Sequence, residues 1–276
     1  MIREYRTICD LSEHCFTASK IQGVTPGELG EVFSPSGDTC ACQVLEVDGD
    51  TVLGAFLESP VGLATETCKV RFFGYGAELS LSEDLLGRTW NSLGEPLDGG
   101  SMILPEKYTS IDALPINPLA RECRTETIGI MGEASIRLGE KGTVFSSPHN
   151  SIAKTIAQLA RNAKIQGGDQ ALIIVISAIG VPFRERELLT DELRRRGLTA
   201  QTVVFASSPA DRPLLHLRTA YTAITAAEYF AFERERHVLL IEADLSAETA
   251  VCAVLEERIG CRKGCEGSIT MLKITM

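Results

Sequence analysis

Residues 143–165 read TVFSSPHNSIAKTIAQLARNAKI. An apolar strand end, Val144 and Phe145, leads into a short polar turn, and an amphipathic pattern follows the turn. The pattern places apolar residues on one face of a helix, at Ile152, Ile156, Leu159 and Ala163. A strand, a turn and a helix in this order predict an α/β fold. The turn then lies at the carboxyl end of a strand, where open α/β sheets bind their ligands.

The same alternation of strands and helices extends from about residue 126 to the end of the chain. Apolar runs predict strands at 143–145, 171–177, 202–206, 238–243 and 268–274. Helical patterns lie between them, over 152–163, 185–196, 214–234 and 247–258. Apolar strands joined by helices predict a parallel sheet that is buried on both faces.

The chain before residue 126 has a different organisation. To about residue 82 its apolar runs are short and are interrupted by turn formers, as on either side of Asp48-Gly49, a strong hairpin signal. This pattern predicts a small β-barrel or sandwich, and closure into a barrel would remove the exposed sheet edges. Prolines and glycines crowd residues 83–125 and predict an extended linker. We therefore expect a barrel over 1–82, a linker over 83–125 and an α/β domain over 126–276.

Composition narrows the classes of function. The 276 residues are 44% apolar and carry a net charge of −10. An acidic chain is a poor partner for nucleic acid or an anionic membrane surface, because both attract basic patches. The longest apolar run, at 171–181, is too short to cross a bilayer, and the N-terminus has no apolar signal core. We expect a soluble, cytoplasmic protein without direct membrane insertion.

The nine cysteines are expected to be reduced thiols, because their number is odd and no signal peptide precedes them. Two pairs invite a metal interpretation, Cys40 with Cys42 and Cys261 with Cys265. Neither pair has the spacing of a zinc knuckle and neither has a nearby histidine. We expect no metal site.

The turn 146–150 is the first candidate for a binding site. A working phosphate loop, G-x-x-x-x-G-K-[ST], wraps phosphates with glycine backbone and contacts them with its lysine. Here both glycines and the lysine-hydroxyl pair are missing, and the nearest lysine, Lys154, lies inside the expected helix. The turn offers other polar groups for nucleotide binding, from Ser146, Ser147, His149 and Asn150.

A structural role explains the same turn. Ser147 suits the N-cap position and Pro148 the first helical position, so helix capping alone accounts for both. Weak anion or nucleotide binding stays open, because a helix N-terminus offers free N–H groups. Nucleotide hydrolysis by this chain alone is not expected without the phosphate-binding cation.

Two further stretches contain candidate carboxylates. The run HVLLIEAD, 237–244, ends in Asp244 and resembles in shape a Walker B strand, whose carboxylate orients magnesium; Asp244 as a helix cap is an equal alternative. Glu185 and Glu187 follow another strand end, where a base could act. A solvated helix with charge pairs explains that stretch better, through Asp191 with Arg195 and Glu192 with Arg196.

The sequence resembles a known family, the B subunit of V-type (vacuolar/archaeal) rotary ATPases. The stretches QVLEVDGD, KVRFFG, LSEDLLGRTWNSLGEPLDGG and LPINPLARE are similar to its barrel and linker, and PHNSIAKTIAQLARNAK is similar to its altered P-loop helix. TAITAAEYFAFERERHVLLIEAD and GSITMLKITM are similar to its core. The resemblance implies a β-barrel followed by a RecA-like, P-loop NTPase-type domain.

The resemblance also implies a function. Such a B-like subunit is non-catalytic and alternates with catalytic A-type subunits in the soluble head of a proton-translocating ATPase/ATP synthase, peripheral to the membrane. It requires no cofactor of its own, and ATP or ADP would bind weakly. The chain departs from the family in its shorter turn and in lacking the C-terminal helical domain. The alternative is therefore a repurposed, truncated paralogue that acts as a stand-alone protein-interaction module.

Overall fold

The computed structural model describes residues 3–132, 134–147, 149–166, 171–246 and 255–275. In this structure the protein divides into two compact units. The first unit comprises residues 1–78 with 110–112, and the second comprises 79–109 with 113–276. The boundary thus falls at Glu78/Leu79, a few residues before the expected position at 82. Most of the segment 83–125, expected as a linker, is part of the second unit.

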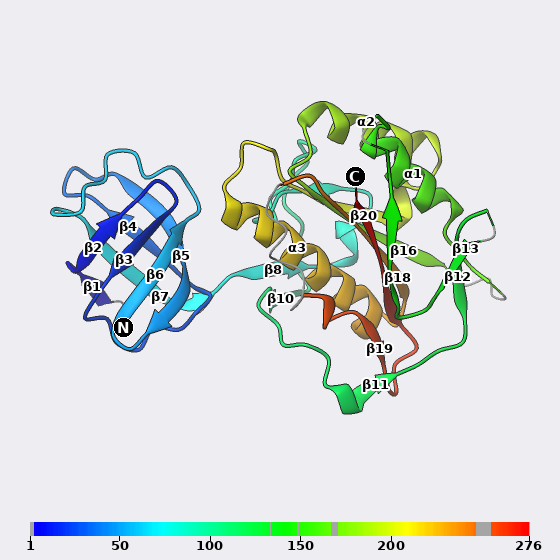
Figure 1. Ribbon diagram of the computed structural model, residues 1–276, viewed down its shortest axis with the longest axis horizontal. Helices are drawn as coiled ribbons and strands as arrows, with labels where there is room; N and C mark the ends of the chain where they lie inside the picture. The colour runs from blue at the N-terminus through cyan, green and yellow to red at the C-terminus, as the bar shows by residue number, and fades with distance from the viewer. Residues whose placement is uncertain (1–2, 133, 148, 167–170, 247–254, 276) are drawn as a thin grey trace. The chain divides into compact units, whose positions relative to one another are not determined.

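The first unit is a seven-stranded antiparallel sheet of order β1-β7-β4-β5-β6-β3-β2 (Figure 1). The strands are β1 (Arg3–Tyr5), β2 (Ile8–Leu11), β3 (Cys15–Ala18), β4 (Glu28–Phe33), β5 (Thr39–Asp48), β6 (Thr51–Phe56) and β7 (Lys69–Gly76). The two edge strands, β1 and β2, are separated by only two residues of chain. The sheet must therefore curl until its edges approach, which produces a nearly closed barrel.

The barrel interior follows from alternation along the strands. In β4 buried and half-buried residues alternate strictly, so every second side chain points inward. Phe16 and Phe56 meet there at 5.2 Å between ring centroids. Cys40 and Cys42 share the inner face, as their spacing predicts, and both are buried among apolar side chains. The predicted hairpin is also present, with β5 and β6 pairing across a two-residue turn.

The second unit is built on an eight-stranded, largely parallel sheet. Its parallel strands are β14 (Lys141–Phe145), β20 (Ser268–Thr275), β18 (His237–Asp244), β16 (Leu172–Ile179), β17 (Thr202–Ala206) and β9 (Thr89–Trp90), in this spatial order. β19 (Gly260–Arg262) pairs antiparallel with β20, and β11 (Arg121–Glu122) pairs antiparallel with β19. Every residue of β16 is buried, as expected for a strand covered on both faces.

Helices cover the sheet on both sides. Helices α1 (Ile152–Asn162) and α2 (Phe183–Arg195) pack on one face, over alternate residues such as Ile174, Ile176 and Ile241. Helix α3 (Pro213–Glu228) covers the other face and continues into a π-helix, Tyr229–Glu233 (Figure 1). The predicted apolar face of α1 is confirmed, since Ile152, Ile156, Leu159 and Ala163 are all buried. The helix predicted over 247–258 lies mainly outside the described residues.

Smaller elements complete the second unit. β12 (Thr127–Met131), β13 (Ala134–Arg137) and β15 (Lys164–Ile165) form a separate three-stranded sheet. β8 (Glu78–Leu81) pairs with β10 (Lys107–Ser110). Single 3₁₀ turns lie at Glu83–Leu85, Pro118–Ala120 and Thr199–Gln201. The segment 83–125 therefore contributes strands to the second unit, with β9 and β11 at opposite edges of the main sheet.

Arg88 fixes part of the segment 83–125. Its guanidinium forms two hydrogen bonds to the carboxylate of Asp98, at 2.8 and 2.7 Å, and lies over the ring of Trp90. It also donates to the carbonyl of Ser101 at 2.6 Å. The guanidinium of Arg88 lowers the pKa of Asp98 to about 2. One side chain thus holds the turn after β9 in place.

Candidate functional site

The turn 146–150 follows β14 directly, is anchored at its first residue and is closed by a hydrogen bond of its own. The backbone N–H of Ser146 donates to the carbonyl of Thr275 on the neighbouring strand at 2.8 Å. Within the turn, the N–H of Asn150 donates to the carbonyl of Ser147 at 2.9 Å. The side chains of Ser147, His149 and Asn150 are exposed. The turn therefore brings the four predicted residues together at the carboxyl end of β14, three of them facing solvent.

The N-cap of α1 is Ser151 and not Ser147, which corrects the capping prediction. The hydroxyl of Ser151 accepts from the N–H of Lys154 at 3.4 Å. The hydroxyl of Ser147 instead accepts from the N–H of His149, inside the turn. Pro148, predicted at the first helical position, lies outside the described residues. The reason is local: Ser151 immediately precedes Ile152, the first buried residue of the helix.

The N-terminus of α1 is occupied by a carboxylate from the same chain. Glu185, in the first turn of α2, accepts from the hydroxyl of Ser151 at 2.7 Å and from the N–H of Ala153 at 3.1 Å. α1 and α2 pack against each other, which positions the two helix starts for this contact. A negative charge is favourable here because the first N–H groups of a helix carry partial positive charge. Glu185 takes the position at which a phosphate loop presents its N–H groups to a ligand.

Nothing cationic from the described part of the turn or the first turn of α1 replaces the missing P-loop lysine. Lys154 is exposed on the helix surface. Glu187, the second carboxylate of the candidate pair, is exposed on α2, away from the buried face. The expected charge pairs on α2 are present in part: Glu192 pairs with Arg196 at 3.1 Å, while Asp191 pairs with Arg194. Arg195 also pairs with Glu192.

Asp244 ends β18, as predicted, and its carboxylate closes a turn. Its Oδ1 accepts from the N–H of Ser246 at 2.9 Å and from the hydroxyl of Ser246 at 2.6 Å. This bonding is typical of an Asx turn, in which an aspartate satisfies the backbone two residues on. Residues 247–254, where a capped helix was expected, lie outside the described part of the chain. Among the described residues no group of three or more metal-ligating side chains gathers.

Sequence inspection missed two buried serine–histidine pairs. Ser207 contacts Nδ1 of His216 at 2.9 Å, and His237 Nδ1 contacts Ser268 at 2.9 Å. Each of the four side chains is less than 10% exposed. Burial lowers the pKa of His237, which favours its neutral form. Both pairs are closed to a substrate, so we assign them to the structure of the domain and not to catalysis.

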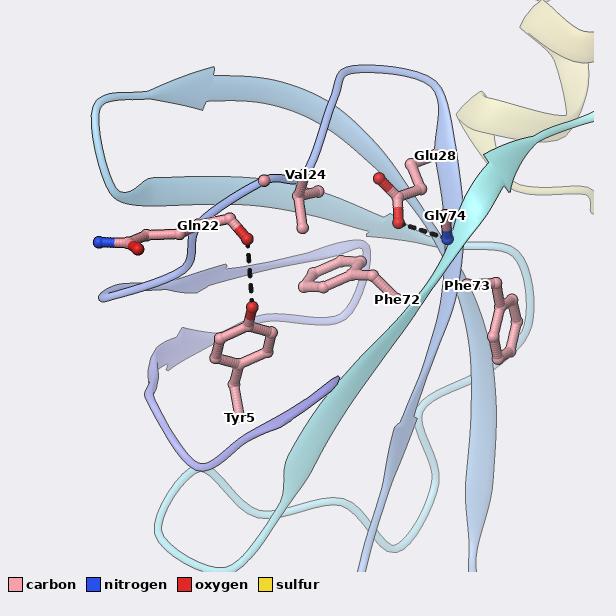
Figure 2. A pocket seen from close by; sticks show the side chains of 8 residues that line it. Tyr5, Gln22, Val24, Glu28, Phe72, Phe73 and Gly74 are labelled. Atoms are coloured by element: carbon pink, nitrogen blue, oxygen red, sulfur yellow. Dashed lines mark hydrogen bonds between the residues drawn. The ribbon is translucent and has the colours of Figure 1, made fainter. Parts of the chain in front are cut away.

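The barrel unit has a hollow of its own, of about 270 Å³, beside Glu28 (Figure 2). The carboxylate of Glu28 is buried and accepts from the N–H of Gly74 at 2.6 Å and of Thr25 at 3.2 Å. Tyr5 donates to the carbonyl of Gln22 across the hollow at 3.2 Å. These bonds tie loops of the barrel together, and the buried carboxylate is already satisfied by backbone. We treat this hollow as structural.

The second unit has a parallel sheet with helices on both faces, and a turn and a helix start lie at the carboxyl end of its edge strand. These features define an α/β domain of the nucleotide-binding class. Residues 130–252 match the ATP synthase alpha/beta family, nucleotide-binding domain. The match supports an alpha/beta-family subunit of an F/V-type ATPase, and it does not single out the V-type B subunit. Within the described residues, no helix combines the length and apolarity required to cross a membrane.

Proposed function

We propose that this chain is a non-catalytic, B-like subunit of a V-type proton-translocating ATPase or ATP synthase. It has a RecA-like domain and supports ATP synthesis or hydrolysis at an interface with a catalytic A-type subunit. One observation carries the non-catalytic part of the proposal. The carboxylate of Glu185 occupies the N-terminus of α1, where a phosphate would have to bind.

Electrostatics explains why this contact opposes catalysis. Phosphoryl transfer relies on positive groups that stabilise charge on the phosphate oxygens. A carboxylate at the helix N-terminus repels that charge and uses the N–H of Ala153 that a phosphate would need. No P-loop lysine offsets it. ATP or ADP would bind weakly in this arrangement, through the turn side chains of Ser146, Ser147, His149 and Asn150.

Exposed apolar side chains in the second unit support assembly with a partner. Leu104 is 85% exposed, Leu114 87% and Leu119 83%, all within the segment 83–125. Large apolar side chains left in water are the groups that a partner surface can cover. They favour the subunit role over a stand-alone module with a polar, well-covered surface.

Co-expression with the catalytic A-type subunit from the same source, followed by mass measurement of the purified complex, tests the proposal. A complex that contains both chains in equal numbers is the expected result. If this chain remains alone while the A-type subunit is folded and present, the subunit role is wrong. The repurposed, stand-alone interaction module would then be the better description.

A further inference from the structure

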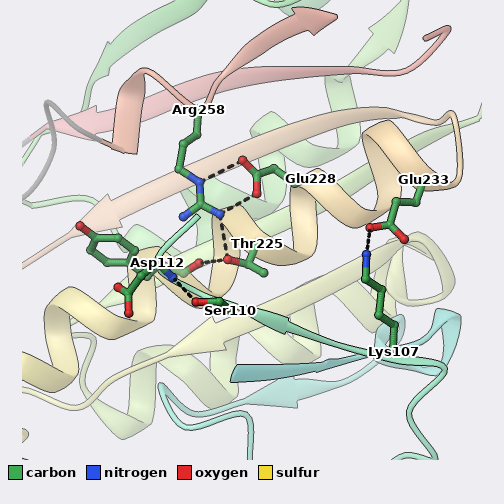
Figure 3. Close-up of polar contacts among 8 residues, drawn as sticks. Lys107, Ser110, Asp112, Thr225, Glu228, Glu233 and Arg258 are labelled. Carbon is green, nitrogen blue, oxygen red and sulfur yellow. Dashed lines mark hydrogen bonds and ion pairs between the residues drawn. The ribbon is translucent and has the colours of Figure 1, made fainter. Parts of the chain in front are cut away.

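Two polar clusters of the second unit are satisfied inside the chain. Arg258, fully buried, donates to both carboxylate oxygens of Glu228, at 2.9 and 2.6 Å, and to the hydroxyl of Thr225 at 3.0 Å (Figure 3). Lys107 likewise pairs with Glu233 at 2.7 Å (Figure 3). Because each charge has its partner in the chain, these clusters do not point to a ligand. An open sheet edge is different, since its outward backbone groups are satisfied only by another strand or by water.

β14 forms such an edge. Within the described part of the chain it pairs only with β20, in parallel and over its whole length. Two hydrogen bonds show which backbone groups face β20. The N–H of Met271 donates to the carbonyl of Glu140 at 3.0 Å, and the N–H of Ser146 donates to the carbonyl of Thr275 at 2.8 Å. Because alternate residues of a strand bond to the same neighbour, the even-numbered positions from 140 to 146 face β20.

The odd-numbered residues Lys141, Thr143 and Phe145 therefore direct their N–H and C=O groups away from β20. All three side chains are exposed, and that of Phe145 is 83% exposed. Val144, between them, packs instead against the apolar core that α1 covers. The strand contains no proline, and Lys141 is its only charged residue. Proline and clustered charge, which commonly protect an edge strand from pairing, are thus missing from it.

The outward backbone groups of β14 are complementary to themselves. In an antiparallel pair with β14 of a second copy, centred on Thr143, each Thr143 faces the other. Lys141 then faces Phe145 of the second copy, and two-fold symmetry repeats this pair. All the facing residues are the odd-numbered ones, whose N–H and C=O groups point outward. Each facing pair exchanges two hydrogen bonds, so about six would form.

The same register suits the side chains. The aliphatic stem of Lys141 would cover the exposed ring of Phe145 from the second copy, while its ammonium group stays paired with Glu256, 3.3 Å away. Gly142 would face Val144, and its missing side chain leaves room for the valine. The two Lys141 side chains would lie at opposite ends of the pair, about 14 Å apart and beyond the reach of strong repulsion.

We propose that two copies of this chain pair through β14, antiparallel about Thr143, and join their main sheets into one continuous sheet. The strand is five residues long, so the contact is small and the dimer is weak and depends on concentration. This pairing goes beyond the subunit role and does not depend on it, because it uses only the sheet edge of the isolated chain.

The test measures the mass of the purified full chain by analytical ultracentrifugation, as its concentration rises to about 1 mM, where even a weak dimer forms. The wild type should pass from monomer to dimer. Thr143→Pro removes an outward N–H that β20 does not use, a change that an edge strand tolerates. It should lower the dimer affinity by about tenfold or more, because both copies lose a hydrogen bond. Thr143→Val, the matched control, keeps the N–H and should dimerise as the wild type does.

The side chain of Phe145 gives a second readout. Phe145→Ala removes the ring that the second copy would cover, and should weaken the dimer by about fivefold. Phe183→Ala is its matched control, since Phe183 is 66% exposed on α2 and lies outside β14. Urea unfolding of each variant shows whether it folds as the wild type does.

Loss of the dimer in Thr143→Pro, with wild-type dimerisation of Thr143→Val, supports the pairing. A wild-type chain that stays monomeric at about 1 mM, or grows beyond a dimer, contradicts it, because a two-fold contact closes on itself. Equal affinities of these two variants also contradict it. If Thr143→Pro does not fold, Phe145→Ala and Phe183→Ala decide, and equal affinities of that pair overturn the proposal. Binding of the A-type subunit is measured separately, by the co-expression described above.

Discussion

The carboxylate of Glu185 and the hydroxyl of Ser151 are joined by a 2.7 Å hydrogen bond at the start of α1. The two residues lie 34 positions apart, on two helices that follow two different strands of the sheet. The bond, with that from the N–H of Ala153, lets the chain satisfy its own helix N-terminus. A position suited to an anionic ligand is thus filled by a side chain.

Removal of this carboxylate should destabilise the second unit. Glu185→Ala leaves the N–H of Ala153 without its acceptor, so the free energy of unfolding should fall by about 1–2 kcal/mol. Glu187→Ala is the matched control on the same helix, because Glu187 is exposed; its effect should stay within about 0.5 kcal/mol. Urea unfolding of both variants measures the difference. Equal effects would show that Glu185 does not hold the start of α1.

The N-cap assignment gives a second prediction. Ser151→Ala should lower the free energy of unfolding by about 1 kcal/mol, since it removes the acceptor for the N–H of Lys154 and the donor to Glu185. Ser147→Ala, in the exposed part of the turn, should have a smaller effect. Thermal or urea unfolding distinguishes the two serines. A larger loss for Ser147→Ala would restore Ser147 as the N-cap.

The Arg88–Asp98 pair predicts a dependence of stability on pH. The folded-state pKa of Asp98, about 2, lies below the value of about 3.9 for an unfolded chain. The carboxylate therefore stabilises the fold fully above about pH 4, and this contribution is lost as the pH falls towards 2. Asp98→Asn should cost about 1–2 kcal/mol at pH 7 and progressively less below pH 4.

The control for this pair is Asp191→Asn. Asp191 and Arg194 are more than 70% exposed, and such surface pairs contribute little. Urea unfolding of both variants at pH 7 and at pH 3 gives the comparison. A loss for Asp98→Asn that is the same at both pH values would contradict the assigned ion pair.

The buried pair of Arg258 and Glu228 predicts non-additive behaviour. Arg258→Met leaves the Glu228 carboxylate without its partner and should cost about 3–5 kcal/mol. The double variant Arg258→Met with Glu228→Met should lose less than Arg258→Met alone, because no uncompensated charge stays buried. A double-mutant cycle measured by urea unfolding tests this. Additive losses would show that the two side chains act independently.

The sequence predicted the parallel strands well, for a physical reason. Strands β16, β17 and β18 are continuous apolar runs because both faces of the sheet are covered, and their observed bounds lie within two residues of those predicted. The apolar face of α1 was equally clear from its spacing. These features depend on local pattern alone.

Features that depend on contacts between distant residues could not be predicted in the same way. The contact of Glu185 with Ser151 requires knowing that α1 and α2 pack side by side. The strands β9 and β11 are two residues each, too short to give a periodic signal in a segment rich in proline and glycine. The π-helix at Tyr229–Glu233 continues the apolar pattern of α3, so no residue type marks the change. The N-cap was assigned to the wrong serine because both serines are good capping residues.

Steady-state ATP hydrolysis by the isolated chain, with magnesium present, tests the central claim most directly. The isolated chain should show no turnover above the background of the buffer, because the carboxylate of Glu185 occupies the start of α1 and the turn sequence lacks the P-loop lysine. Turnover that rises in proportion to the concentration of this chain, and persists through further purification, would contradict it.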